Sequence, residues 1–288
     1  MKDLVPKEHL AKIVGVAVRV GLYVVLGVLG MYLFGWGLSA LGSYLVAAAV
    51  GGFLAAATAN ALLMRIFERS HLANIGLAWN ACSVRNLLIG LAGGTGSAVL
   101  VLAGPVVVGL AEFQAVPGAD PHWRTLIFVT VVLLLGAVGE EMFFRGYGFQ
   151  VLIASAGPFA TILPTGVLFG LAHGSNLGVT KLGLFNTMVW GVLLGYAFVR
   201  SGDLWLPIGL HVGWNWALPL FGVNLSGFTM EVTGYALHWR IGPVWSGGAY
   251  GPEGGLITSA VTVLLFVYLW KAPVRRQTPF LLRGSEES

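Results

Sequence analysis

Charged residues are scarce in this chain. They make up 10% of its 288 residues, whereas hydrophobic residues make up 57%. Soluble domains carry about 25% charged residues. This scarcity excludes an ordinary soluble domain and indicates an integral, multi-pass membrane protein. Cys82 is the only cysteine, so no intrachain disulfide can form.

Several hydrolase motifs are also missing. The six histidines form no H-E-x-x-H zinc-protease motif, and the chain has no G-x-S-x-G nucleophile elbow. An aspartyl-type G-x-G-D site is excluded as well, because Arg200 stands where its first glycine would be, ahead of Ser201-Gly202-Asp203. The net charge of +4 is spread along the chain and does not indicate nucleic-acid binding.

Long apolar runs dominate what is present. About 20 apolar residues span a bilayer as a helix, and the runs predict an all-α bundle of eight transmembrane helices. We expect these near residues 17–38, 43–64, 87–111, 124–145, 158–176, 182–199, 204–222 and 256–271. Eight crossings place every Lys and Arg except Arg124, Lys181 and Arg240 on the side of the termini. By the positive-inside rule both termini are then cytoplasmic. As a separate expectation, the protein lies in a prokaryotic cell membrane.

The chain divides into three predicted regions. These are an N-terminal three-span region (1–112), a four-span core (113–223), and an external loop with the last span and tail (224–288). Glycines four apart let helix backbones approach closely, and such pairs occur at 90/94, 166/170, 191/195 and 209/213. The basic segment 65–86 fits either an amphipathic surface helix or an ordinary loop. The glycines and prolines of the 224–255 loop indicate ordered turns.

The strongest functional signal is Glu140-Glu141-x-x-x-Arg145, which directly follows an apolar run. An ionised group at the centre of a membrane helix costs about 2.5–3.5 kcal/mol, so such groups mark functional sites by default. Residues four apart share a helix face, which allows Arg145 to pair with Glu141. Glu140 points about 100° away and is free to act as a general base. A helix-packing Glu–Arg pair without catalysis is the alternative.

Two further spans carry polar residues. His173 ends an apolar run one turn after Phe169, and His211 and Asn215 lie one turn apart inside a later span. Two histidines and a carboxylate are a common set of zinc ligands. The same groups also suit metal-free hydrolysis, in which Glu140 activates water and His173 and Asn215 stabilise the oxyanion. A hydrogen-bonded position at the helix interface is the simpler explanation of His173 alone, whereas the His211 and Asn215 pair inside a span is harder to explain by helix bridging.

Together the three motifs resemble a known family. Glu-Glu-x-x-x-Arg, Phe-x-x-x-His and His-x-x-x-Asn, in this order within residues 125–222, are similar to the CPBP family of intramembrane proteases. This family comprises type II CAAX prenyl endopeptidases and bacteriocin-processing or bacteriocin-immunity (Abi) proteins. The resemblance covers about a third of the chain, and the first three spans carry no recognisable motif.

The resemblance implies a role for each motif residue. Glu140 would activate the attacking water, with Glu141 and Arg145 in support. His173, His211 and Asn215 would bind a metal or the tetrahedral intermediate. The implied cofactor is a divalent metal, zinc by expectation, held by Glu140, His173 and His211. A mechanism without metal stays open.

The depth of these residues in the membrane restricts the length of the fourth helix. Adjacent spans run in opposite directions and rise 1.5 Å per residue, so Glu140 reaches the histidines only if its helix continues past Arg145 to about Ala154. We therefore predict a long or kinked fourth helix.

The sequence supports two hypotheses about function. The first is an intramembrane metalloendopeptidase. Its substrate would be a membrane-associated protein or peptide, either of the CAAX type or of another kind. The second is a non-catalytic immunity or peptide-binding scaffold protein. The expected partners are that substrate and the lipid bilayer, without nucleic acid. The sequence identifies neither the substrate nor the oligomeric state.

Overall fold

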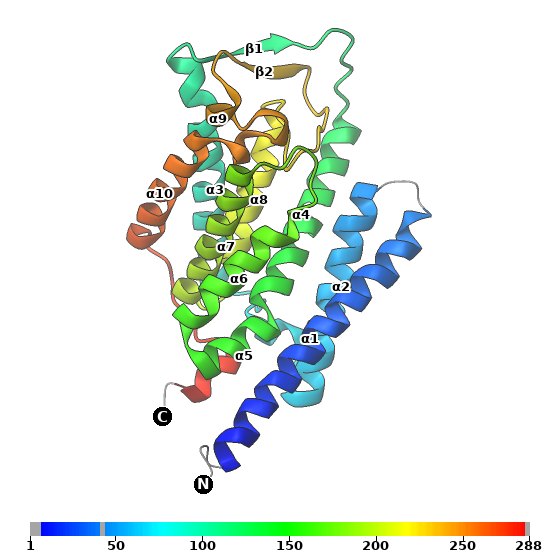
Figure 1. The fold of residues 1–288 in the computed structure, drawn as a ribbon, viewed down its shortest axis with the longest axis vertical. Coiled ribbons are helices and arrows are strands. Elements are labelled where there is room, and N and C mark those ends of the chain that lie inside the picture. The colour runs from blue at the N-terminus through cyan, green and yellow to red at the C-terminus, as the bar shows by residue number, and fades with distance from the viewer. Residues whose placement is uncertain (1–6, 41–43, 286–288) are drawn as a thin grey trace.

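The computed structural model describes residues 7–40 and 44–285, and within these ranges the chain is nearly all helical (Figure 1). This confirms the predicted fold class. The apolar helices are α1 (Lys7–Ser39), α2 (Tyr44–Phe67), α3 (Ala81–Val107), α4 (Trp123–Arg145), α5 (Tyr147–Ala156), α6 (Pro158–Ala172), α7 (Lys181–Ser201), α8 (Trp205–Leu220) and α10 (Leu256–Lys271). The first residue of the predicted 43–64 span, Ser43, lies outside the described residues.

The helices differ in how well their lengths fit a bilayer. Within the described ranges, five segments are long and apolar enough to cross one, with α4 and α5 taken together as 123–156. Helices α6, α8 and α10 have 15, 16 and 16 residues, fewer than the roughly 20 that span a bilayer. The chain is thus an integral membrane protein by its helices, while the count of eight crossings stays a prediction.

Both ends of the described chain lie at one end of the bundle, the lower end in Figure 1. There α1 begins, and the segment after α10 ends in the short 3₁₀ helix η4 (Phe280–Ser285). This arrangement agrees with termini on one side of a membrane. Residues 1–6 and 286–288 lie outside the described ranges, so the cytoplasmic placement of the termini stays a prediction.

The fourth apolar segment is long and kinked, as predicted. Helix α4 ends at Arg145 and α5 begins at Tyr147, with Gly146 between them at φ −76° and ψ −143°. This backbone conformation is not helical. A Cβ at position 146 would collide with the Met142 carbonyl oxygen and with the Asn60 side chain, so glycine is required there.

The segment between α2 and α3 is a compact loop. Helix α2 runs to Phe67, and the loop contains only the 3₁₀ helix η1 (Leu72–Ile75) before α3 begins. Asn80 caps α3 by accepting the backbone N–H groups of Cys82 and Ser83. The alternative of an amphipathic helix over 65–86 was wrong, because Ile75 is buried in the protein core instead of facing lipid. The predicted helix 158–176 likewise ends earlier, at Ala172.

The 224–255 loop contains the ordered turns expected from its sequence and, in addition, a strand. Strand β2 (Tyr235–Trp239) pairs antiparallel with β1 (Ala111–Ala115) over the end of the bundle opposite to η4 (Figure 1). Short helical turns follow at α9 (Pro243–Ser246), η2 (Gly248–Tyr250) and η3 (Pro252–Gly254). The strand was not predicted, because its partner is more than a hundred residues away in the sequence.

The glycine pairs hold the helices of the core together. Gly90 and Gly94 of α3 face Gly209 and Gly213 of α8, and a Cβ on Gly94 would collide with the carbonyl oxygen of Leu210. Helices α6 and α7 meet in the same way at Gly166 and Gly191, with the glycine backbones in contact. These close approaches confirm the predicted tight packing. They also fix the helices that carry His173 and His211.

Candidate active site

The site is built around the end of α4, where a buried ion pair forms. Arg145 Nη1 lies 3.1 Å from Glu141 Oε1, and both side chains are almost completely buried. Arg145 also donates to the Gly191 carbonyl oxygen at 2.8 Å and lies over the ring of Phe169. The predicted Glu141–Arg145 pair is therefore present, and it connects α4 with α6 and α7.

Glu141 has a second partner, His211 of α8. Its Oε1 atom lies 2.8 Å from His211 Nδ1, and the histidine is buried. A carboxylate accepts and does not donate, so Nδ1 carries a proton. In the neutral imidazole this leaves the Nε2 lone pair free, and Nε2 faces Glu140.

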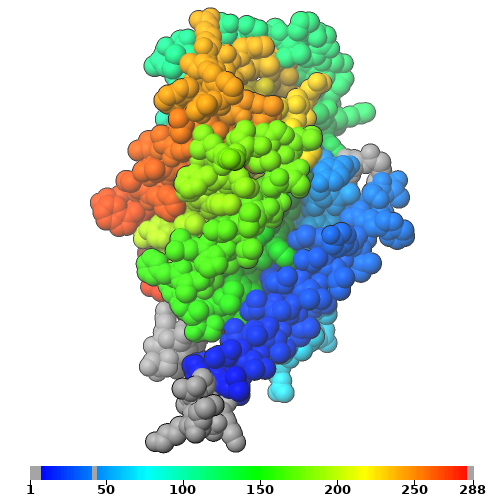
Figure 2. Space-filling view, viewed as in Figure 1, coloured from blue at the N-terminus to red at the C-terminus, as the bar shows by residue number. Residues whose placement is uncertain are grey.

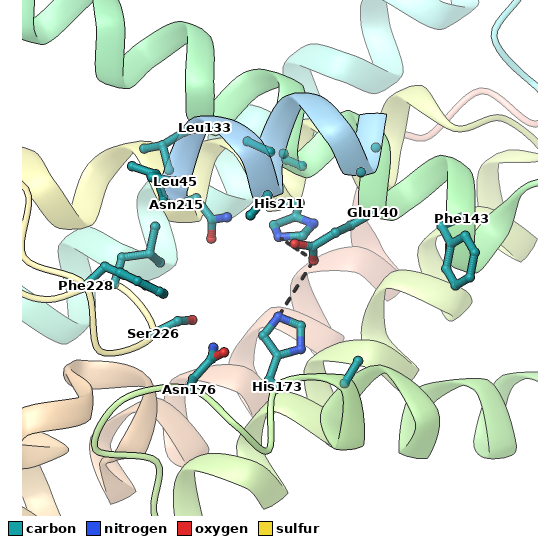
Figure 3. Close-up of a pocket in the computed structure, with 18 of the residues that line it drawn as sticks. Leu45, Leu133, Glu140, Phe143, His173, Asn176, His211, Asn215, Ser226 and Phe228 are labelled. Carbon is teal, nitrogen blue, oxygen red and sulfur yellow. Dashed lines mark ion pairs between the residues drawn. The ribbon is translucent and has the colours of Figure 1, made fainter. Parts of the chain in front are cut away.

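Glu140 turns away from this pair and into a cavity (Figure 3). Its Oε2 atom lies 3.8 Å from His173 Nε2 and 3.8 Å from His211 Nε2. That oxygen is buried and has no hydrogen-bond partner within the described residues. A buried polar atom without a partner is costly, which marks this point as a place for a ligand, a water molecule or an ion.

His173 is oriented by its own helix. It caps the C-terminus of α6, and its Nδ1 atom lies 2.8 Å from the Phe169 carbonyl oxygen. Because a carbonyl oxygen only accepts, Nδ1 donates. Its ring also lies against that of Phe169. Both histidines therefore use Nδ1 for orientation and direct Nε2 toward Glu140.

Asn215 lines the same cavity from α8. In Figure 3 it lies beyond His211, on the side of the cavity that holds Ser226 and Phe228. The structure thus brings Glu140, His173 and His211 together, with Glu141 and Arg145 directly behind them. Asn215 stands further along the wall.

The cavity has a volume of about 1190 Å³. Part of its wall is apolar and comes from α1, α2 and α4, including Val28, Met31, Trp36, Leu45, Ala48 and Leu133. On the face shown in Figure 2, the surface is recessed between the blue N-terminal helices and the green helices that follow. No lysine or arginine is among the described residues that line the cavity.

Sequence reasoning missed the polar residues that the 224–255 loop contributes. Ser226 and Glu253 line the cavity, and Glu253 Oε2 accepts hydrogen bonds from the backbone N–H and the hydroxyl of Ser226. Burial raises the pKa of the Glu253 carboxyl above its ordinary value. No motif marks these residues, since only the fold of the loop brings them to the site.

The donor set of the site fits a metal in its chemistry. Two imidazole nitrogens and a carboxylate oxygen are ligands that zinc takes, and the unpartnered Glu140 oxygen lies between the two nitrogens. Among the described residues, however, no group of three or more His, Cys, Asp or Glu side chains is arranged so that it could hold a metal ion. The metal therefore stays a prediction.

A comparison with protein families gives an independent result. Residues 122–217 match the family model described as type II CAAX prenyl endopeptidase Rce1-like. The match runs from the start of α4 into α8, so it contains all six predicted site residues. No curated protein matches the chain. The resemblance read from the three motifs is thus confirmed over this segment, and residues 122–217 are similar to Rce1-like type II CAAX prenyl endopeptidases.

Proposed function

We propose that this protein is an intramembrane endopeptidase that hydrolyses a peptide bond of a membrane-associated protein or peptide. The observation that carries the proposal is the position of Glu140. Its buried, unpartnered Oε2 atom lies 3.8 Å from two histidine nitrogens and faces a large cavity between membrane helices. A carboxylate so placed is in the right environment to act on a water molecule.

The proposed reaction uses Glu140 as the base. Glu140 takes a proton from water, and the water oxygen attacks the carbonyl carbon of the scissile bond to give a tetrahedral intermediate. The C–N bond then breaks, and the proton passes from Glu140 to the leaving nitrogen. Glu141 holds His211 in place and is itself neutralised by Arg145, so it supports the site without touching the substrate.

The histidines have two roles open to them. With Nδ1 protonated, a neutral His173 or His211 offers a lone pair at Nε2. That lone pair binds a metal but does not donate to an oxyanion. Glu140, His173 and His211 would hold a divalent metal, which would polarise the carbonyl group and lower the pKa of bound water. Without a metal, a histidine has to be doubly protonated to stabilise the oxyanion, and the Asn215 amide is the other donor.

The cavity wall supports a substrate that is largely apolar. Residues of α1 and α2 give the wall an apolar surface, where a lipid-modified or membrane-embedded segment fits. A prenylated CAAX-type peptide belongs to this class. The described lining offers no Lys or Arg for a free C-terminal carboxylate, so an internal membrane segment is an equally good candidate.

The test is hydrolysis by purified protein in detergent. Three fluorogenic peptides serve as probes: a farnesylated CAAX peptide, its unmodified form, and an internal transmembrane sequence. We expect Glu140→Gln to reduce hydrolysis by at least roughly 10²-fold while the protein keeps its elution profile. Glu112→Gln is the matched control, because Glu112 lies on exposed β1. Full activity of Glu140→Gln would contradict the assigned base, and binding of the peptides by wild-type protein without cleavage would favour the scaffold alternative.

A further inference from the structure

The kink between α4 and α5 is bridged by a side chain from the N-terminal helices. In an unbroken helix each N–H donates to the carbonyl four residues earlier. The break at Gly146 interrupts this series, so carbonyl groups before it and N–H groups after it need other partners. Inside a membrane no water is present to form hydrogen bonds with these backbone groups. Each group left without a hydrogen-bond partner costs several kcal/mol.

Asn60 of α2 supplies both kinds of partner. It is completely buried. Its Nδ2 atom donates to the Met142 carbonyl oxygen at 3.0 Å, and its Oδ1 atom accepts the Tyr147 N–H at 2.7 Å. One carboxamide therefore bonds to the last turn of α4 and to the first residue of α5. A leucine of similar size would satisfy neither group.

Tyr23 of α1 adds a second contact at the same point. Its buried hydroxyl lies 2.7 Å from the Met142 carbonyl oxygen and 2.9 Å from that of Phe143. The Asn60 Nδ2 atom lies 3.1 Å from the Tyr23 oxygen. The two side chains thus form one connected network on the kink. Both come from helices outside the segment that matches the family.

The network lies directly beside Glu140 and Glu141 in the sequence. Met142 follows Glu141, and Arg145 precedes the kink residue. Rotation of the last turn of α4 would swing Glu140 away from His173 and His211, because side-chain direction changes by about 100° per helical residue. The 3.8 Å separations from Oε2 thus depend on how the kink is held.

We infer that Asn60 and Tyr23 are positioning residues, which fix the α4–α5 kink and so aim Glu140 at the two histidines. The inference rests on the proposed function of Glu140, but it concerns the N-terminal helices, for which the sequence motifs give no role. Those helices then do more than anchor the chain, since they complete the site of the segment that matches the family.

The first experiment separates turnover from binding. Asn60→Leu removes the hydrogen bonds to Met142 and Tyr147 together with those to Tyr23 and Ala56. Tyr23→Phe removes only the hydroxyl while it keeps the ring contact with Phe143. We expect kcat to fall roughly 10- to 100-fold in Asn60→Leu and several-fold in Tyr23→Phe, with KM nearly unchanged, because small misplacements of a catalytic group have effects of this size. Asn60→Asp keeps the acceptor for the Tyr147 N–H and should restore part of kcat.

Control variants exclude a general loss of stability. Leu102→Ala opens a hole in the buried core of α3, far from the kink in sequence, and Ser97→Ala removes a buried hydrogen bond within α3. Both should keep kcat per folded molecule. If Leu102→Ala lowers kcat as much as Asn60→Leu at equal thermal stability, the positioning role is wrong.

The second experiment measures the kink without reference to catalysis. In a Cys82→Ser background, which is free of cysteine, nitroxide labels at Val131 on α4 and Ser155 on α5 occupy exposed positions. Double electron–electron resonance should show a shifted or broadened distance distribution in Asn60→Leu and, to a smaller extent, in Tyr23→Phe. Glu140→Gln should keep the wild-type distribution, so failure of the proposed function and failure of this inference are distinguishable. Unchanged distributions in both kink variants, or a shifted distribution with unchanged kcat, would overturn the inference.

Discussion

His211 Nδ1 and Glu141 Oε1 lie 2.8 Å apart, in a contact that joins α8 to α4 inside the bundle. The same carboxylate pairs with Arg145 at 3.1 Å. One buried carboxylate thus orients a histidine and neutralises an arginine. Removing it would leave a buried cation without a counter-ion and an imidazole without its hydrogen-bond partner.

Glu141→Gln should therefore be strongly destabilising. Breaking a buried ion pair by removing one partner costs about 3–5 kcal/mol, because the remaining charge stays buried. We expect a clearly lower melting temperature in detergent together with a loss of hydrolysis. Glu112→Gln breaks an ion pair with Arg240 that is exposed and should melt almost like the wild type. Equal melting temperatures for the two variants would contradict the structural role of Glu141.

The amount of bound metal should depend on Glu140, His173 and His211, whose side-chain polar atoms lie close together. Glu140→Ala, His173→Ala and His211→Ala should each lose most of the zinc bound by purified protein, measured by elemental analysis after dialysis. Asn215→Ala should keep it, since Asn215 lies further along the cavity wall (Figure 3). Glu141→Gln should weaken zinc binding about 10- to 100-fold, because it replaces the charged partner of the His211 Nδ1 atom with a neutral amide. Full hydrolysis by metal-free protein would instead support the glutamate mechanism.

The sequence predicted the helices and the Glu141–Arg145 pair well, for a physical reason. Apolar runs and residues four apart are local features, so the eight apolar segments and the Glu141–Arg145 pair follow from them directly. The need to bring Glu140 to the depth of His173 even predicted the kinked fourth helix. These inferences required no knowledge of how distant segments pack.

The parts that were missed depend on distant contacts. Asn60 is one polar residue in an apolar run, and nothing in its local sequence shows that Met142 and Tyr147 lie beside it. Ser226 and Glu253 reach the cavity only because the 224–255 loop folds over the bundle. The pairing of β1 with β2 is likewise a contact between segments far apart in the chain.

Helix α3 provides a matched pair of glycines for testing how α8 is held. A Cβ on Gly94 would collide with the Leu210 carbonyl oxygen, whereas one on Gly96 meets nothing within 4 Å. Gly94→Ala should cost about 1–3 kcal/mol through overpacking and lower activity, because it pushes on the helix that carries His211. Gly96→Ala should be neutral or slightly stabilising. Thermal unfolding and hydrolysis measured side by side check this, and equal behaviour of the two variants would contradict the close packing of α3 on α8.

Asp203 should hold the C-terminal segment against the start of α8. Its Oδ2 atom accepts hydrogen bonds from Asn86 at 2.7 Å and Gln277 at 2.6 Å, and its Oδ1 atom accepts the backbone N–H of Leu206. An amide nitrogen cannot accept, so Asp203→Asn loses part of this set, at about 1.5–3 kcal/mol. Trypsin should then cut faster at Arg275, which follows α10 in the sequence. Asp120→Asn, at an exposed position, is the control and should leave the cleavage rate unchanged.

The same residue gives a pH dependence whose sign follows from its burial. Desolvation is the largest cause that raises the pKa of Asp203 above its ordinary value of 3.8. The folded protein then holds this proton more tightly than the unfolded chain, so the stability that protonation contributes is complete below pH 3.8. It is lost as the pH rises through the folded pKa. The melting temperature of the wild-type protein minus that of Asp203→Asn should therefore be largest in acid. This difference should decrease as the pH rises toward neutral. A relative stability that increases with pH would show that the hydrogen bonds from Asn86 and Gln277 outweigh the burial of the carboxyl group.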